Sequence, residues 1–182
     1  MAGPLREDRL LAAAAQQQTV FSPEIDEQAF RAACSRFATG ITIATLRGMD
    51  GKPHGVTVNS FTSVSCVPPL ILFCLKTKSS VIDHFNKANT FAINILDVSQ
   101  QAVCDRFARR IEDRFEGIAW EWGPAGAPRL LGVLACMECR KQQTVECGDH
   151  AIFIGEVIRA DYRDGTPLVF FAREYGAIQR LE

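Results

Sequence analysis

The stretch that decides the fold reads TVNSFTSVS at residues 57–65, and two prolines follow at positions 68 and 69. Val, Thr and Ser favour extended backbone, so the stretch predicts a β-strand that continues into a polar loop. Its five hydroxyl groups, one amide and one aromatic ring would suit a planar heteroaromatic ligand with polar edges. On composition alone, an ordinary edge strand rich in Thr and Ser explains the same residues.

A helix is predicted before this stretch. Phe30, Cys34 and Phe37 recur at helical spacing and form one apolar stripe. Side chains that can cap a helix, and a proline suited to the first turn, occur within residues 22–26, where the helix is expected to begin. Gly40 is placed to end it.

The rest of the chain predicts a mainly β domain of short strands joined by turns. Alternation or short apolar runs predict strands at residues 41–45, 54–65, 70–75, 91–96, 131–147, 150–162 and 168–171. Asp-Gly pairs at residues 50–51 and 164–165 predict hairpin turns. Ser79 and Ser99 are expected to cap two short helices. Short strands separated by turns favour an antiparallel barrel with covering helices.

Residues 108–129 show no clear period, and they contain several glycines and prolines around Trp120 and Trp122. An irregular stretch of this length in a compact domain is typical of a lid or an interface element, or it hides a regular element that the pattern does not show. We interpret residues 22–182 as one domain and residues 1–21, rich in Ala and Gln, as a flexible or helical tail.

Composition and charge exclude several classes of protein. Of the 182 residues, 47% are apolar and 23% are charged, which excludes disordered and collagen-like chains. The net charge of -1 provides no general attraction for nucleic acid or for an anionic membrane. The longest apolar run within the predicted fold, residues 70–75, is far shorter than a membrane-spanning helix. No secretory signal pattern is present, so we expect a cytoplasmic protein.

The seven cysteines are scattered and are interpreted as reduced, buried thiols. Cys136 and Cys139 form a C-x-x-C pair, but a structural zinc site would require a second pair of ligands. Their surroundings predict a strand, in which positions three apart face opposite sides. Dinucleotide-binding G-x-G-x-x-G, P-loop and H-E-x-x-H motifs are absent from the sequence, and the three histidines are spread along it. We therefore expect no metal site.

Gly148, Asp149 and His150 form a second distinctive segment. Gly-Asp is typical of a turn between two strands, so the ring of His150 is expected at the start of a strand. At the mouth of a barrel such a ring can donate a hydrogen bond to a carbonyl group or stack on a ligand ring. A structural or solvent-facing histidine is the plainer alternative.

Taken together, the order and spacing of these motifs resemble the short-chain flavin reductase family, whose domain is the FMN-binding split barrel. The resemblance covers roughly residues 22–178 and rests on Phe30-Arg31, residues 37–43, 57–65 and 68–69, Ser79-Ser80, residues 91–94, Asp113-Arg114-Phe115, residues 131–135, Glu138-Cys139, residues 148–150 and 155–157, Phe170-Phe171 and Tyr175-Gly176. It implies a mainly β split barrel with short covering helices. It also implies an NAD(P)H:flavin oxidoreductase, which supplies reduced flavin to a partner monooxygenase.

The resemblance also implies which residues form the site. Residues 57–65 are expected to contact the isoalloxazine and ribityl groups, through Thr57, Asn59, Ser60, Phe61, Thr62 and Ser65. Lysines next to a capped helix start form an anion site, so the flavin phosphate is assigned to Lys78, Ser79 and Ser80. A solvated turn explains these lysines equally well. His150 is expected on the nicotinamide side of the flavin, with a role in orientation, and Arg173 and Tyr175 are expected to help to hold the pyridine nucleotide.

The expected cofactors are FMN or FAD, with NADH or NADPH as the hydride donor. Members of this family are usually homodimers, and Trp120 and Trp122 are candidate interface groups. A separate flavin-dependent oxygenase is the expected partner. Three alternatives stay open: a flavin carrier with the same barrel that needs no His150, ferric reduction through reduced flavin, and a thiol-based redox or metal protein that uses Cys136, Cys139 and Cys147.

Overall fold

The computed structural model describes residues 26–179, and the predicted tail at residues 1–21 lies outside that range. The chain divides into two units, residues 1–34 and 35–182. Mainly β structure with a few short helices makes up the second unit. None of the helices within residues 26–179 has the length and apolar character needed to span a bilayer.

Helix α2 (Glu27–Cys34) is the described part of the first unit. A carboxylate oxygen of Asp26 accepts a hydrogen bond from the Ala29 amide at 2.6 Å, so Asp26 caps the helix, in agreement with the expected start. The predicted end at Gly40 is wrong, because the helix stops six residues earlier and strand β1 (Thr39–Gly40) is already extended.

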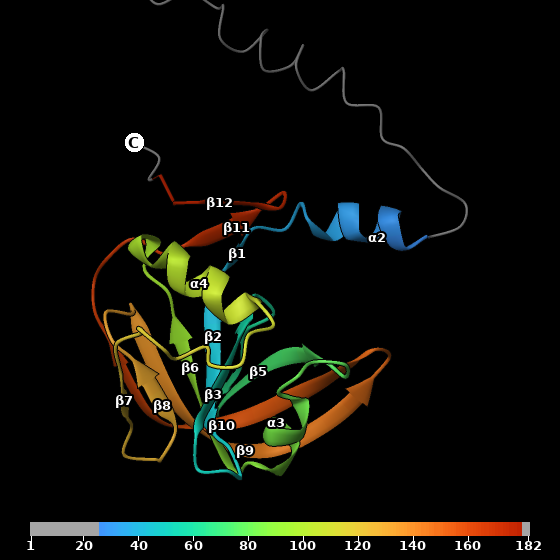
Figure 1. The fold of residues 1–182 in the computed structure, drawn as a ribbon. Coiled ribbons are helices and arrows are strands. Elements are labelled where there is room, and N and C mark those ends of the chain that lie inside the picture. The colour runs from blue at the N-terminus through green and yellow to red at the C-terminus, as the bar shows by residue number, and fades with distance from the viewer. Residues whose placement is uncertain (1–25, 180–182) are drawn as a thin grey trace, which may run out of the picture. The chain divides into compact units, whose positions relative to one another are not determined.

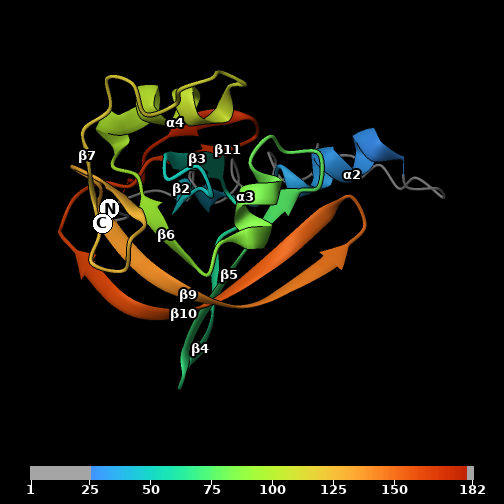
Figure 2. The same ribbon diagram turned by 60° about the horizontal axis from the view of Figure 1, so that its bottom comes forward.

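A seven-stranded antiparallel sheet forms the body of the second unit, in the order β3-β2-β6-β9-β10-β5-β4. Figures 1 and 2 show that it is strongly curved and that β9 and β10 form one long bent hairpin. Its edges, β3 and β4, are not hydrogen-bonded to each other, so the barrel stays split. The strands are β2 (Thr42–Arg47), β3 (Pro53–Val58), β4 (Thr62–Cys66), β5 (Pro69–Lys76), β6 (Thr90–Ile95), β9 (Ala135–Cys147) and β10 (His150–Tyr162).

In the described part of the second unit, two small sheets and three short helical segments accompany the large sheet, as Figure 1 shows. One small sheet has the order β1-β11-β12, and the other pairs β7 with β8. The remaining elements are α3 (Ile82–Lys87), the 3-10 turn η1 (Val98–Gln100), α4 (Gln101–Ala108), β7 (Trp120–Trp122), β8 (Pro128–Leu130), β11 (Val169–Phe171) and β12 (Glu174–Gly176).

Tertiary contacts override the local pattern at two predicted elements. The strand predicted at residues 54–65, which was expected to continue into a polar loop, ends at Val58, and after a bend at residues 59–61 the chain forms a second strand, β4. The irregular residues 108–129 contain β7 and the start of β8, in agreement with the expected possibility of a hidden regular element. The last hairpin is not at residues 164–165 but between β11 and β12, where Ala172 and Arg173 have φ values of 51° and 71°.

Both predicted serine caps are also wrong. Helix α3 begins after Val81, and no side chain caps it. Asp97, two residues before Ser99, caps η1 and forms a capping box with Gln100. Aspartate accepts two hydrogen bonds from the backbone and hydroxyl of Ser99, which explains why it takes the capping position that the pattern assigned to the serine.

Strand β2 is buried on both faces, which explains why five of its six residues are buried and the predicted alternation is absent. One face contributes Ala44 and Leu46 to a core that contains the packed rings of Phe73, Phe85, Phe91 and Phe153. The other face contributes Ile43 to a second core with residues of α4. Helix α4 therefore covers the face of the sheet that would otherwise be exposed to solvent.

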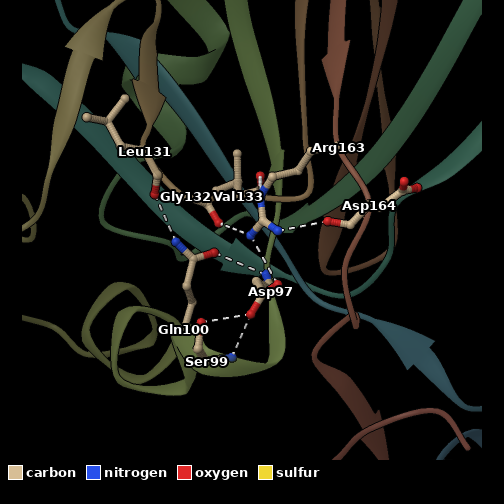
Figure 3. Close-up of polar contacts among 8 residues, drawn as sticks. All are labelled: Asp97, Ser99, Gln100, Leu131, Gly132, Val133, Arg163 and Asp164. Carbon is tan, nitrogen blue, oxygen red and sulfur yellow. Dashed lines mark hydrogen bonds and ion pairs between the residues drawn. The ribbon is translucent and has the colours of Figure 1, made fainter.

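Arg163 ties three segments of the second unit together (Figure 3). Its guanidinium group donates hydrogen bonds to the backbone oxygens of Gly132 at 2.6 Å, Val133 at 3.1 Å and Asp164 at 2.9 Å. It also forms an ion pair with the Asp97 carboxylate at 3.0 Å. The chain between β8 and β9 is thereby fastened to the cap of η1.

Replacing Arg163 with alanine is expected to lower the free energy of unfolding by about 1–2 kcal/mol, because several charge-assisted hydrogen bonds are lost together. Thermal unfolding should show a Tm decrease of about 3–6 °C for a chain of this size. The matched control is Arg140→Ala, which breaks one exposed pair with Glu156 and is expected to cost less than about 0.5 kcal/mol. Equal losses in both variants would contradict the prediction.

Candidate functional site

A cleft with a volume of about 350 Å³ opens where β3, β5, the start of β10 and the end of α4 meet. We call it the cation-rimmed cleft. It is lined by Val56, Thr57, Val58, Asn59, Ser60, Cys74, Leu75, Lys76, Lys78, Ser79, Ser80, Ala108, Arg110, Arg114 and His150. The hydroxyl-rich segment and the histidine that the sequence singled out therefore border one volume.

The bend after β3 is held in place by two side chains of the hydroxyl-rich segment. Ser60 Oγ accepts a hydrogen bond from the Cys74 amide at 2.9 Å and donates one to the Cys74 carbonyl oxygen at 3.1 Å. Thr57 Oγ1 donates to the carbonyl oxygen of Cys104 in α4 at 2.7 Å. Both hydroxyls thus shape the cleft. The exposed side-chain amide of Asn59, in contrast, has no hydrogen bond within residues 26–179 and is available to a ligand.

Positive charge surrounds the cleft. Lys76, Lys78, Arg110 and Arg114 line it, and none of its described lining residues is acidic. The Lys78 side chain has no ionic partner among the described residues. Four cations and no carboxylate in the lining favour an anionic group such as a phosphate, while the Asp149 carboxylate lies just outside the lining, paired with His150.

Arg114 stabilises the cationic side of the cleft through hydrogen bonds to three neighbouring segments. Its guanidinium group donates to the carbonyl oxygens of Arg109 at 2.8 Å and Gly55 at 3.2 Å and to Ser80 Oγ at 3.2 Å. Burial lowers its pKa, although an arginine stays protonated at neutral pH. The residue belongs to the motif at residues 113–115 on which the resemblance rests, but sequence reasoning assigned no site role to it or to Arg110.

His150 reaches the cleft from the tight turn between β9 and β10. Gly148 in that turn has a φ of 60°, a conformation that glycine adopts readily. The carbonyl oxygen of Asp149 accepts hydrogen bonds from the amide and hydroxyl of Thr77, which fastens the turn to the lysine-containing loop. His150 Nδ1 lies 2.7 Å from the Asp149 carboxylate. The hydrogen bond from His150 lowers the pKa of Asp149.

Tyr175 lies beside the cleft in a hollow of about 230 Å³ that shares Thr57, Asn59 and Ala108 with it. Its hydroxyl donates to the Asp105 carboxylate at 2.7 Å, and burial raises the pKa of the phenol. Tyr175 is thus adjacent to the cleft rather than part of its lining.

The other predicted site residues lie outside the cleft lining. Phe61 packs against the aromatic core, and Thr62 is exposed on β4. Ser65 Oγ accepts a hydrogen bond from the Val67 amide at 3.2 Å. Arg173 is exposed in the turn between β11 and β12.

The two cysteines of the C-x-x-C pair are buried in different clusters, as the strand pattern predicted. Burial raises the pKa of Cys139 to about 12, and it also raises that of Cys136. The reactive form of cysteine is the thiolate, which both environments disfavour. The surroundings of these two cysteines therefore do not support the thiol-based alternative, whose third residue, Cys147, is exposed.

The fold and the cleft define a mainly β protein of the flavin reductase type, and comparison with known proteins gives the same result. The family model of the flavin reductase like domain matches residues 34–179. The chain therefore belongs to the flavin reductase-like family, as its motifs predicted. The expected fold class and the enzyme class, an NAD(P)H:flavin oxidoreductase, are confirmed with it.

Among its relatives, the FMN reductase (NADH) SmoA of Agrobacterium fabrum is 41% identical over 155 residues, covering 85% of this chain and 88% of that protein. The flavin-dependent monooxygenase reductase subunit HsaB of Rhodococcus jostii is 36% identical over 88% of this chain and 82% of its own. The structure of the NADH:FAD oxidoreductase SgcE6 of Streptomyces globisporus superimposes with a TM-score of 0.82 at 33% identity, covering 91% of this chain and 98% of that chain.

Relatives also occur in longer proteins. A probable flavin reductase of Rhizobium meliloti is 46% identical over 72% of this chain, but the matched region spans only 42% of that protein.

Proposed function

We propose that this chain transfers a hydride from NADH to FMN or FAD at the cation-rimmed cleft. The observation that carries the proposal is that polar groups of residues 57–60, four cationic side chains and His150 border one volume of about 350 Å³. Small-molecule sites typically have volumes of about 300–1,000 Å³. When bound, the flavin and the nicotinamide supply the redox chemistry themselves, so the protein has to bind, orient and polarise them.

The cleft offers separate groups for the two ends of a flavin. The free amide of Asn59 and the backbone of residues 57–60 are proposed to bind the polar edge of the ring system, where hydrogen-bond donors stabilise negative charge. Lys78, Ser79 and Ser80 are proposed to hold the phosphate. Because α3 has only six residues and no side-chain cap, this anion site depends on the cations rather than on a helix terminus.

The nicotinamide is assigned to the side of the cleft formed by His150. The carboxylate of Asp149 orients the His150 ring, which leaves the other ring nitrogen for a ligand. Tyr175, in the adjacent hollow, is proposed to contact the pyridine nucleotide. Cofactor contacts by Phe61, Thr62, Ser65 and Arg173 remain predictions made from the sequence.

Reduced flavin is proposed to pass to a separate oxygenase, since HsaB is named as the reductase subunit of a flavin-dependent monooxygenase. A homodimer is proposed as well, with the β7–β8 hairpin as part of the interface. Trp122 of this hairpin is 38% exposed, and the Arg47 guanidinium group lies 4.0 Å from the centre of its ring. A cytoplasmic location and the domain limits at residues 22–182 stay predictions.

Steady-state turnover tests the proposed activity. The full chain is mixed with NADH or NADPH and with FMN or FAD, and the loss of nicotinamide absorbance is followed. We expect oxidation that requires added flavin and is faster with NADH. Flavin binding without flavin-dependent oxidation of either nucleotide would instead identify a flavin carrier.

Replacing Lys78 and Ser79 together with alanine is expected to raise the flavin KM about 5- to 20-fold, because one charge-assisted and one neutral contact are lost. The KM for NADH and the kcat at saturating flavin should change little. Lys87→Ala, on α3 and outside the cleft lining, is the matched control. An unchanged flavin KM in the double variant would place the phosphate elsewhere.

A further inference from the structure

A second polar cluster, outside the cation-rimmed cleft, brings together Asp50, His54 and His84. One carboxylate oxygen and two imidazole nitrogens of these residues all lie within 4.8 Å of one another. Nε2 of His54 lies 3.1 Å from each carboxylate oxygen of Asp50. None of the three residues lines the cleft, so the cluster is independent of the proposed function.

The three side chains come from separate segments that the fold brings together. Asp50 belongs to the turn between β2 and β3, His54 to β3 and His84 to α3. The two imidazole rings are stacked, with centres 3.8 Å apart and planes inclined by 20°. The amide of Lys52 donates a hydrogen bond to Asp50 Oδ1 at 3.0 Å, which orients the carboxylate.

Because Gly48 has no side chain, it leaves room for the carboxylate of Asp50 and the imidazole of His54. A Cβ atom at this position would lie 2.5 Å from Asp50 Oδ1 and 2.6 Å from His54 Nε2. A side chain at position 48 would therefore displace the carboxylate and the imidazole from their present positions.

We propose that Asp50, His54 and His84 form a binding site for a divalent transition-metal ion of the zinc class, with water completing the coordination. Two imidazoles and one carboxylate are a ligand set that such ions accept. Tetrahedral zinc holds imidazole nitrogen at about 2.0–2.1 Å, which places neighbouring ligand atoms about 3.4 Å apart. The 3.1 Å between His54 Nε2 and Asp50 Oδ1 is close to this value. Because the two imidazole rings are stacked and an imidazole binds a metal in its own plane, the proposal requires one of the rings to rotate when the ion binds.

Zinc titration followed by NMR of the imidazole nitrogens tests the proposal, because the chain has only three histidines. The full chain is first dialysed against a chelator and then titrated with Zn²⁺. We expect the signals of His54 and His84 to shift together and to saturate at one Zn²⁺ per chain. The signals of His150 should not move at that stoichiometry.

Histidine-to-glutamine variants provide the matched comparison, with calorimetric titration of Zn²⁺ as the readout. His54→Gln and His84→Gln are each expected to weaken Zn²⁺ binding by at least about 10- to 100-fold. Losses of this size already follow when a residue that only hydrogen-bonds to a metal ligand is replaced. His150→Gln should bind Zn²⁺ as the unmodified chain does. Thermal unfolding without metal shows that each variant is folded, and Gly48→Ala, which displaces the ligands without removing one, should also weaken binding.

Three results would overturn the proposal. The first is no saturable binding by the unmodified chain. The second is an unchanged affinity in both His54→Gln and His84→Gln, and the third is a loss confined to His150→Gln. Titration with Co²⁺ adds a further check, because a thiolate-to-cobalt charge-transfer band would assign the ion to one of the free cysteines instead.

Discussion

Replacing His150 with alanine is expected to lower kcat/KM for NADH by about 10- to 100-fold, the loss that follows from removing one or two orienting contacts worth about 1–3 kcal/mol. The imidazole lies at the edge of the cation-rimmed cleft and is oriented by the Asp149 carboxylate. Because the phosphate and ring contacts proposed for the flavin come from other residues, flavin binding should be almost unchanged. Stopped-flow oxidation of NADH and fluorescence titration of flavin measure the two effects separately.

The matched control is Thr144→Ala, an exposed position on the same β9–β10 hairpin that does not line the cleft. This substitution should leave both kcat/KM for NADH and the affinity for flavin unchanged. If His150→Ala weakened flavin binding and NADH use equally, the histidine would have a structural role, and the nicotinamide would have to be placed elsewhere.

Replacing Gly155 with alanine is expected to lower the free energy of unfolding by about 1–3 kcal/mol through overpacking of the core. A Cβ at this position of β10 would collide with the ring of Phe91, with Cε1 only 2.8 Å away, and would lie 3.1 Å from Cys139 Cβ. The Phe91 ring packs edge-on against Phe73, so it has little room to move. Thermal unfolding should show a Tm decrease of about 3–10 °C for a chain of this size.

Gly176→Ala in β12 is the control for this substitution. A Cβ there meets no atom within 4 Å, so its Tm should be unchanged or slightly raised. A Tm for Gly155→Ala equal to that of the unmodified chain would mean that the aromatic core adjusts without cost, contrary to the close packing of protein interiors.

Much of the site could be predicted from residues that are neighbours in the sequence. Residues 57–60 and His150 were singled out by hydroxyl content and turn chemistry, and both border the cleft. Arg114 could not be assigned in this way, because an arginine in an irregular stretch has no local feature that distinguishes it from a solvated one. Its hydrogen bonds to Gly55 and Ser80 exist only after distant segments are brought together.

The cluster of Asp50, His54 and His84 shows the same limit. The histidines are spread along the sequence, which gives no reason to place two of them together, yet the rings of His54 and His84 stack on each other in the structure. Strand β2 shows the same limit in the fold. Its alternation predicted a strand, but the sequence did not show that two separate cores cover both of its faces.

By itself, the amino-acid sequence determined the hairpin turns at residues 50–51 and 148–149, the approximate strands and the family. Turn chemistry and residue period act within a few neighbouring positions, and motif order is read directly along the chain. Only the tertiary structure decided that the cations, the Asn59 amide and His150 meet at one cleft, and that Asp50, His54 and His84 meet at another place. The physical reason is that these groups come from different strands, helices and turns. Their distances are set by the packing of the sheet against its helices, which no local pattern encodes.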